Sequence, residues 1–141
     1  MSRISLSKAH LSGCELTYIQ NAFELNQVSI YGDNLKNFEN NLEEYLNENK
    51  YVTCLSSGTA GIHLSLLKLN INQGDEVICQ TFTFCGSANP IIYQGAKPIF
   101  VDSEPETWNM CPLHLEAAIK DRISKGKKPK AIIIVHLYGM P

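Results

Sequence analysis

No stretch of this 141-residue sequence is apolar for long enough to cross a bilayer, and the N-terminus lacks the apolar run of a signal peptide. An excess of positive charge is absent as well, since the formal net charge is −2 and the pI is about 6.1. The composition therefore does not favour a nucleic acid or an anionic membrane as a partner, and we expect neither. The lysines between residues 125 and 130 form the one basic cluster, which we expect to be a solvated loop.

Cysteine occurs five times, and no two cysteines stand at a CxxC spacing. Neither a disulfide framework nor a zinc site is predicted, because the number is odd and the four histidines do not stand at ligand spacing from the cysteines. We therefore expect no metal. Cys54 and Cys79 lie inside apolar, strand-like runs, which is typical of buried thiols in a reducing compartment. The sequence thus predicts a cytoplasmic protein.

Apolar periodicity predicts two helices in the first third of the chain. Apolar residues three and four positions apart form one stripe over residues 13–25. Asp33 is suited to be the N-cap of a second helix, whose apolar face follows it. On this basis residues 1–50 are interpreted as an N-terminal helical segment.

After residue 50, short apolar strands alternate with helices. This alternation predicts an α/β fold with a mostly parallel sheet and flanking helices over residues 51–141. The last apolar run is continuous, so we expect that strand to be covered on both faces. Pro90 falls inside a predicted helix, where it would remove a hydrogen bond and could kink the axis. The predicted strands are 51–55, 76–80, 97–102 and 131–136, and the predicted helices are 60–69, 84–94 and 112–124.

The segment Ser57-Gly58-Thr59 joins a predicted strand to a predicted helix. Its backbone amides would form a helix N-terminus, where an anion is favoured, and the hydroxyls of Ser57 and Thr59 could donate to phosphate oxygens. Gly58 would let a ligand approach the backbone closely. The motif is neither a Walker loop nor a GxGxxG sequence, and by itself it is better explained as a plain N-cap with a tight turn.

The second segment with possible chemistry is Thr81-Phe-Thr-Phe84, at the carboxyl end of the next predicted strand. Ligands bind at this end of the strands in sheets of this type, and a flat heteroaromatic ligand needs a ring on which to stack. Two phenylalanines of an ordinary core also explain the segment. Taken alone, this second explanation is the better one.

Five segments taken together, in order, favour the functional interpretation. Their succession resembles the DegT/DnrJ/StrS family of pyridoxal-phosphate-dependent aminotransferases, and the resemblance covers essentially the whole chain. The stretches at 4–7 and 31–39 also match the N-terminal part of that family. The five segments are Leu-Ser-Ser-Gly-Thr-Ala-Gly-Ile-His-Leu (55–64), Gly-Asp-Glu-Val-Ile (74–78), Thr-Phe-Thr-Phe (81–84), Gly-Ala-Lys-Pro-Ile-Phe-Val-Asp (95–102) and Val-His-Leu-Tyr-Gly (135–139).

The resemblance implies a fold, a cofactor and a reaction. The fold would be the N-terminal part of an aspartate-aminotransferase-like (fold type I) large domain, so that 51–141 would be an incomplete domain. The cofactor would be pyridoxal phosphate, which supplies an electron sink. The reaction would transfer an amino group, usually from glutamate, to a nucleotide-linked keto-sugar, and the N-terminal pattern looks most like enzymes for UDP-linked 4-keto-6-deoxy sugars. The full-length family enzyme is expected to be a homodimer.

The resemblance also implies roles for single residues. The turn at Ser57, Gly58 and Thr59 would hold the cofactor phosphate, and Phe84, rather than Phe82, would stack on the pyridine ring. Tyr31 and Gly32 would approach the substrate. His136, at the end of the fourth predicted strand, is expected to be a core histidine rather than a catalytic group.

No catalytic residue is expected within these 141 residues. In the family, the aspartate that pairs with the ring nitrogen, the Schiff-base lysine and the small C-terminal domain all follow later in the chain. We therefore expect the chain alone to be inactive, and the strand at 51–55 to lack the neighbours it has in the family. Two alternatives stay open: a truncated product or part of a split gene that binds a phosphate or a partner, and an unrelated α/β nucleotide-binding module.

Overall fold

The computed structural model describes residues 4, 8–47 and 49–140. Contacts between Cα atoms divide the chain into two compact units, Met1–Cys54 and Leu55–Pro141. The family-like stretch at residues 5–7 lies outside the described residues. No helix in the described part of the chain is long and apolar enough to span a membrane.

The first unit contains two helices, α1 (Glu15–Glu24) and α2 (Asp33–Leu46), so both helix predictions are confirmed. Neither helix has a buried residue. The N-cap prediction is wrong, because Gly32 occupies that position and Asp33 is already in the first turn. The side chain of Gln27 satisfies this end of α2 instead, since its Oε1 atom accepts the N–H of Asp33 at 2.9 Å.

The predicted strand at 51–55 does not form. Two carboxylates of α2 bind its backbone instead: Glu43 accepts the N–H of Val52 at 2.7 Å, and Glu39 accepts the N–H of Cys54 at 2.8 Å. The spacing explains the match, because the four residues from Glu39 to Glu43 rise about 6 Å along the helix, close to the length of two extended residues, about 6.6 Å. The backbone of this strand-like sequence is thus hydrogen-bonded to a helix rather than to a sheet.

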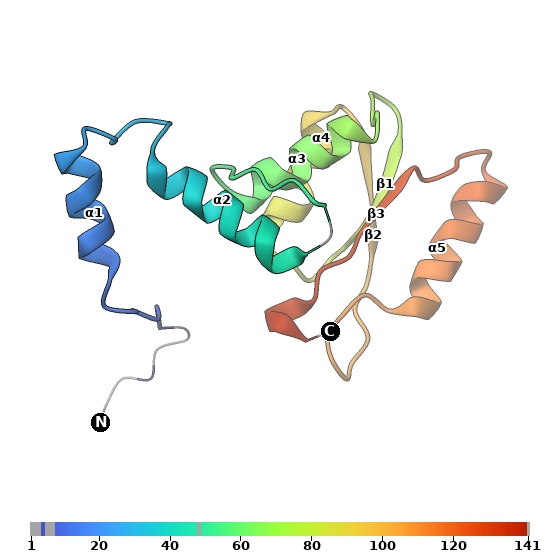
Figure 1. Ribbon diagram of the computed structural model, residues 1–141. Helices are drawn as coiled ribbons and strands as arrows, with labels where there is room; N and C mark the ends of the chain where they lie inside the picture. Colours follow the sequence, from blue (N-terminus) through green and yellow to red (C-terminus); the bar gives the residue numbers. More distant parts are fainter. Residues whose placement is uncertain (1–3, 5–7, 48, 141) are drawn as a thin grey trace. The chain divides into compact units, whose positions relative to one another are not determined.

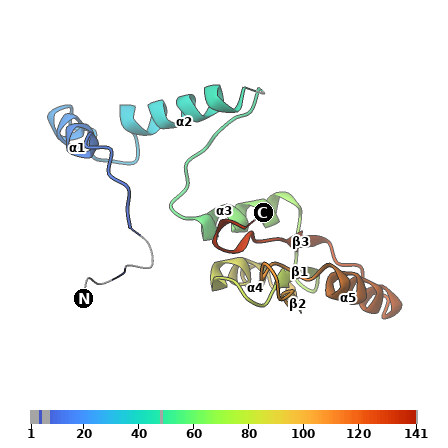
Figure 2. The same cartoon turned by 90° about the horizontal axis from the view of Figure 1, so that it is seen from below.

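The second unit is built on a three-stranded parallel sheet with the order β2-β1-β3 (Figures 1 and 2). The central strand β1 pairs with β2 over its whole length and with β3 over three residues, and it is completely buried. The α/β prediction and the parallel sheet are therefore confirmed. The strands are β1 (Glu76–Gln80), β2 (Lys97–Val101) and β3 (Ala131–Ile133).

Helices cover both faces of this sheet, with α3 (Gly58–Lys68) and α4 (Asn89–Tyr93) on one side and α5 (Pro112–Ser124) on the other (Figure 1). Strand alternation divides the core between the two faces. The α3 and α4 side contains Leu66, Ile71, Val77, Cys79, Ile91 and Ala96, and the α5 side contains Ile78, Val101 and Met110.

Strand β3 is shorter than predicted and lies at an edge of the sheet. Coverage on both faces is contradicted, because Ile132 and Ile134 are 41% and 60% exposed. The prediction of a core histidine at His136 is also wrong, since this residue is exposed. The apolar run was correct as a strand signal, but an edge strand has only one neighbouring strand and one covered face here.

The predicted helix over 84–94 is divided in two. A single 3-10 turn, η1 (Cys85–Ser87), precedes the short helix α4. Pro90 therefore lies in the first turn of α4 rather than inside a longer helix. A proline in a first turn removes no helical hydrogen bond, so the expected kink does not arise.

Two ion pairs fix the amino end of the sheet. Arg122 of α5 donates to both carboxylate oxygens of Glu76, with Nε–Oε2 and Nη2–Oε1 distances of 2.8 Å and 2.6 Å. These hydrogen bonds lower the pKa of the Glu76 carboxyl. Lys130, just before β3, pairs with Asp75 at 2.7 Å. The carboxyl end of the sheet has no such pair in the part of the chain that the structure describes.

Candidate functional site

Helix α3 begins at the turn Ser57-Gly58-Thr59, which was predicted to bind a phosphate. Ser57 is its N-cap, and the Ser57 Oγ atom accepts the N–H of Ala60 at 3.1 Å. The plain N-cap interpretation is therefore correct, and it leaves the anion-binding interpretation open. Among the described residues, no acceptor is found for the N–H groups of Gly58 and Thr59, which remain at the positive end of the helix dipole.

Gly58 faces open space, since a Cβ atom built on it would meet no atom within 4 Å. Its backbone conformation is not one that requires glycine, because its φ angle lies outside the left-handed range. The protein itself therefore gives no reason for glycine at this position. Room for a ligand beside the exposed amides is a physical reason that fits.

Gly86 brings the two candidate segments together. A Cβ atom built on Gly86 would lie 2.6 Å from Thr59 Oγ1 and 2.9 Å from Phe84 Cδ1. A hydroxyl of the predicted phosphate turn and an aromatic ring therefore meet around one buried glycine of η1. Sequence reasoning placed Thr59 and Phe84 in one site but did not identify Gly86, whose only sequence signal was its position two residues after the aromatic.

Phe82 and Phe84 line the same hollow, of about 500 Å³, at the carboxyl end of β1. Phe84 is 76% exposed, whereas Phe82 is 49% exposed because its ring packs against Trp108 at a centroid distance of 5.2 Å. The interpretation as two core phenylalanines is contradicted by this exposure. The remaining lining residues are Thr81, Thr83, Val135, Leu137 and Tyr138, so no lysine faces the hollow in the described structure.

A second hollow, of about 310 Å³, shares Phe82, Leu137 and Tyr138 with the first. Trp108 lines it, and the backbones of Trp108 and Tyr138 have φ angles of 64° and 50°. Left-handed backbone at a bulky residue costs about 1–3 kcal/mol and is found mainly at functional sites. Neither residue was singled out from the sequence, because a strained backbone has no periodicity signal.

Asn109 fixes the chain that carries Tyr138. Its Nδ2 atom donates to the carbonyl of Met140, and its Oδ1 atom accepts the N–H of Leu137, both at 3.0 Å. One amide side chain thus holds both ends of the short 3-10 turn η2 (Leu137–Gly139). The wall formed by Leu137 and Tyr138 is therefore tied to the loop that carries Trp108.

Tyr31 and Gly32, the predicted substrate residues, belong to the first unit, whereas the four predicted cofactor residues belong to the second. They line a hollow of about 660 Å³ together with Gln27 and Asp33. Tyr31 is 78% exposed. Gly32 has an internal reason to be glycine, because a Cβ atom there would lie 3.2 Å from that of Gln27.

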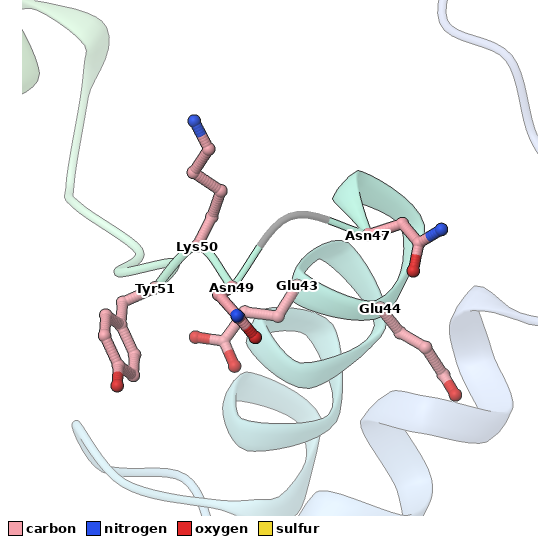
Figure 3. A pocket seen from close by; sticks show the side chains of 6 residues that line it. All are labelled: Glu43, Glu44, Asn47, Asn49, Lys50 and Tyr51. Atoms are coloured by element: carbon pink, nitrogen blue, oxygen red, sulfur yellow. The ribbon is translucent and has the colours of Figure 1, made fainter.

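Another hollow of the first unit, of about 620 Å³, contains none of the predicted site residues. It lies where α2 ends, and Figure 3 shows the side chains of Glu44, Lys50 and Tyr51 extending in different directions rather than converging. No cluster of three or more metal-ligating side chains occurs among the described residues.

The second unit therefore brings the predicted phosphate turn and an exposed ring side by side. Thr59 and the free amides of the α3 N-terminus can bind a phosphate, and Phe84 can stack on a flat ring. Pyridoxal phosphate contains these two groups on one small molecule. The residues present fit this cofactor.

A profile of the DegT/DnrJ/EryC1/StrS aminotransferase family matches residues 11–141. EpsN of Bacillus subtilis, assigned by name as a pyridoxal phosphate-dependent aminotransferase, is 47% identical over 97% of this chain and 35% of its own length. The GDP-perosamine synthase of Escherichia coli O157:H7 is 42% identical over 100% of this chain and 37% of its own length. The chain thus spans little more than a third of the curated relatives that it matches.

Solved aminotransferase structures are similar to this chain in fold as well as in sequence. The aminotransferase from Psychrobacter cryohalolentis has a TM-score of 0.80 at 31% identity, covering 94% of this chain and 32% of its own. NtdA from Bacillus subtilis, solved with bound cofactor PMP, has a TM-score of 0.69 at 35% identity, covering 92% of this chain and 29% of its own. PMP is the amino form of pyridoxal phosphate, so the comparisons and the geometry of the turn point to one cofactor.

Proposed function

Because the chain belongs to the DegT/DnrJ/EryC1/StrS aminotransferase family, we propose that it supplies the phosphate turn and the ring-stacking wall of a pyridoxal-phosphate-dependent sugar aminotransferase. The complete reaction transfers an amino group from an amino-acid donor, glutamate, to a nucleotide-linked keto-sugar. Pyridoxal phosphate is the cofactor, and when bound it supplies the electron sink of the reaction. The complete enzyme is proposed to be a homodimer.

One observation carries the proposal: Thr59 and Phe84 approach each other across Gly86. The two segments are 25 residues apart in the chain, yet the hydroxyl of Thr59 at the α3 N-terminus and an exposed ring lie side by side. A structural turn needs no exposed ring beside it, and a core phenylalanine is not 76% exposed. The pairing of the two features supports a ligand that has both a phosphate and an aromatic ring.

The residues of this chain act by binding and orienting the cofactor. The amides of Gly58 and Thr59 and the Thr59 hydroxyl donate to the phosphate, which places the ring against Phe84. The hydroxyl of Ser57 can donate its proton to the phosphate while its oxygen still accepts the N–H of Ala60. No described lysine lines this hollow, so covalent anchoring and proton transfer need groups beyond those that line it.

The cofactor assignment is tested with pyridoxamine phosphate, an amine that cannot form a Schiff base with surface lysines. Its phosphorus resonance is followed by NMR while it is titrated into the 141-residue chain. Gly58→Val should weaken binding at least about tenfold, because two methyl groups would occupy the space beside the helix amides. Gly61→Ala, one turn further along α3, is the control, since its added methyl meets only Leu55 at 3.8 Å.

An unchanged affinity in Gly58→Val would contradict the assignment of the phosphate turn. Loss of affinity in both variants would point to a general disturbance of α3 rather than to the turn. Phe84→Ala provides the second arm, because it removes the stacking ring and should weaken binding by roughly two- to tenfold. Phe82→Ala should have the smaller effect on affinity.

The substrate is proposed to be a UDP-linked 4-keto-6-deoxy sugar, bound near Tyr31 and Gly32. The N-terminal sequence pattern supports UDP, whereas the relatives named GDP-perosamine synthase support a GDP-linked sugar as the second candidate. Saturation-transfer NMR of the chain with UDP-sugar and GDP-sugar compares the two directly. Stronger transfer to the GDP compound, lost in Tyr31→Ala, would replace UDP by GDP in the proposal.

A second candidate function is a phosphate- or partner-binding module without transaminase activity. The absence of a lysine from the lining of the Phe84 hollow in the described structure favours it. Binding of inorganic phosphate as tight as that of pyridoxamine phosphate would support this candidate, because the ring would then contribute nothing. A clear preference for the ring-bearing compound would support the aminotransferase.

A further inference from the structure

Gln80, the last residue of β1, is a polar side chain in the most buried part of the molecule, with 1% exposure. Its Nε2 atom donates to the carbonyl of Trp108 at 2.9 Å and to the carbonyl of Phe82 at 3.1 Å, and lies 3.4 Å from Ser103 Oγ. The orientation of the amide follows from these partners. A flipped amide would turn its oxygen toward two carbonyl oxygens, so the nitrogen must face them.

The other end of the same amide has no partner. Gln80 Oε1 is buried and accepts no hydrogen bond, and it is the one such side-chain atom found in the described residues. A buried acceptor without a donor is destabilising, whereas an apolar side chain of similar shape would not carry that cost. The neighbours Val77, Ile78 and Cys79 on the same strand are all apolar. The unpaired oxygen therefore offsets part of the stability that the hydrogen bonds of Nε2 contribute.

The two carbonyls that Gln80 holds belong to the two aromatic residues that pack on each other. Phe82 lies in the turn that leads from β1 to Phe84, and Trp108 lies in the loop after β2 with its backbone in the left-handed region. One amide group thus joins two separate loops at the wall between the two hollows. Removing the amide would leave the strained Trp108 backbone without this hydrogen bond.

We propose that Gln80 is a positioning residue, which holds the Phe82 turn and the Trp108 loop together so that Phe84 is presented to the ring of the bound cofactor. The proposal rests on the function proposed above, because it assigns Phe84 to the same ring. Gln80 acts through its hydrogen bonds to the backbone and does not line either hollow. Its role is to keep the wall in place, at a cost in stability from its unpaired oxygen.

The test uses Gln80→Met, which keeps the length of the side chain and removes both donors. The 141-residue chain contains one tryptophan, so fluorescence reports on Trp108 alone. We expect quenching of Trp108 by acrylamide to increase about twofold or more in Gln80→Met, because the carbonyls of Phe82 and Trp108 lose the donor that joins them. Affinity for pyridoxamine phosphate should fall roughly two- to tenfold.

Glu76→Gln is the matched control, because it changes a buried polar residue at the opposite end of the same strand. It should lower stability and, under conditions where the chain is folded, leave the quenching of Trp108 and the affinity unchanged. A purely structural Gln80 would show the same pattern as this control, with lower stability and unchanged quenching and affinity, and that result would overturn the proposal.

The cofactor assignment and the positioning role of Gln80 can be contradicted separately. If the wild type does not bind pyridoxamine phosphate, the cofactor assignment fails, and the quenching of Trp108 still decides whether Gln80 holds the wall. If the wild type binds but Gln80→Met changes neither the quenching nor the affinity, the positioning role is contradicted and the cofactor assignment stands. Gln80→Leu repeats the measurement with a second apolar side chain in case Gln80→Met does not fold.

Discussion

The two units of the chain differ in how far their apolar residues are buried. In the first unit, helices α1 and α2 contain no buried residue, and Phe23 of the α1 stripe is 68% exposed. In the second unit, all five residues of β1 are buried between two helical layers. Periodicity alone made both sets of elements predictable, but only the second unit has a core of its own.

This difference indicates that the second unit contributes most of the free energy of folding. Burial of apolar area is the main favourable term in folding, and exposed stripes contribute little of it. The second unit also contains the bidentate ion pair between Glu76 and Arg122, whose side chains are 5% and 16% exposed. Changes in the second unit should therefore cost much more than comparable changes in the first.

The largest effect is expected for Glu76→Gln, which leaves Arg122 without its buried partner. Breaking a buried ion pair on one side costs about 3–5 kcal/mol, so the free energy of unfolding should fall by that order. The free energy of unfolding of the second unit is measured by urea unfolding, with the fluorescence of Trp108 as the signal. The surface change Lys120→Ala, which removes an exposed pair with Glu116, should cost about 1 kcal/mol or less.

The same pair predicts a dependence on pH. Hydrogen bonds from Arg122 lower the pKa of Glu76 in the folded state. The stability that this shift contributes is present above the unfolded pKa, about 4.3, and is lost as the pH falls through the lower folded pKa. The difference between the wild type and Glu76→Gln should therefore be constant near neutral pH and shrink in acid. A difference that grows in acid would contradict the direction of the shift.

A smaller but still large contrast is expected between Ile78→Ala and Phe23→Ala. Ile78 is completely buried, so its truncation should cost about 2–5 kcal/mol, whereas truncation of the exposed Phe23 should change stability by about 0.5 kcal/mol or less. Far-ultraviolet circular dichroism follows both units during urea unfolding. Similar costs for the two variants would remove the distinction between the units.

A smaller loss of stability than for Glu76→Gln or Ile78→Ala, about 1–3 kcal/mol, is expected for Gly86→Ala. The new methyl would lie 2.6 Å from Thr59 Oγ1 and 2.9 Å from the Phe84 ring, so one of these groups must move. We expect affinity for pyridoxamine phosphate to fall with the stability. Calorimetric titration checks this, with Gly61→Ala as the control, and an affinity equal to that of the wild type would show that the close approach is not needed.

Much of the second unit could be predicted from its sequence. Strand β1 and helix α5 have the predicted bounds, and β2 differs by one residue, because strand periodicity and the proline at the start of α5 are local signals. Segment 51–55 and strand β3 could not be predicted correctly, since their pairing depends on strands and carboxylates that are remote in sequence. A local pattern specifies an extended chain but not its partner.

Some residues of the candidate site could be predicted from the sequence and others could not. Ser57, Gly58, Thr59 and Phe84 were named from the turn and from the family resemblance, and the structure brings Thr59 and Phe84 together. Gly86, Gln80 and Trp108 were missed, because close packing, buried hydrogen bonds and a strained backbone are properties of the assembled fold. The turn and the resemblance named the candidate ligand-binding groups, but not the residues that hold them in place.

The central claim is that the second unit binds the phosphate and the ring of the cofactor, without a covalent bond to this chain. The most direct measurement treats the 141-residue chain with pyridoxal phosphate and borohydride, maps any modified lysine by mass spectrometry, and titrates pyridoxamine phosphate in parallel. We expect saturable binding of pyridoxamine phosphate that is lost in Gly58→Val, no modification concentrated at a single lysine, and no transaminase activity. A stoichiometric adduct at one lysine, or binding that Gly58→Val leaves unchanged, would contradict the account.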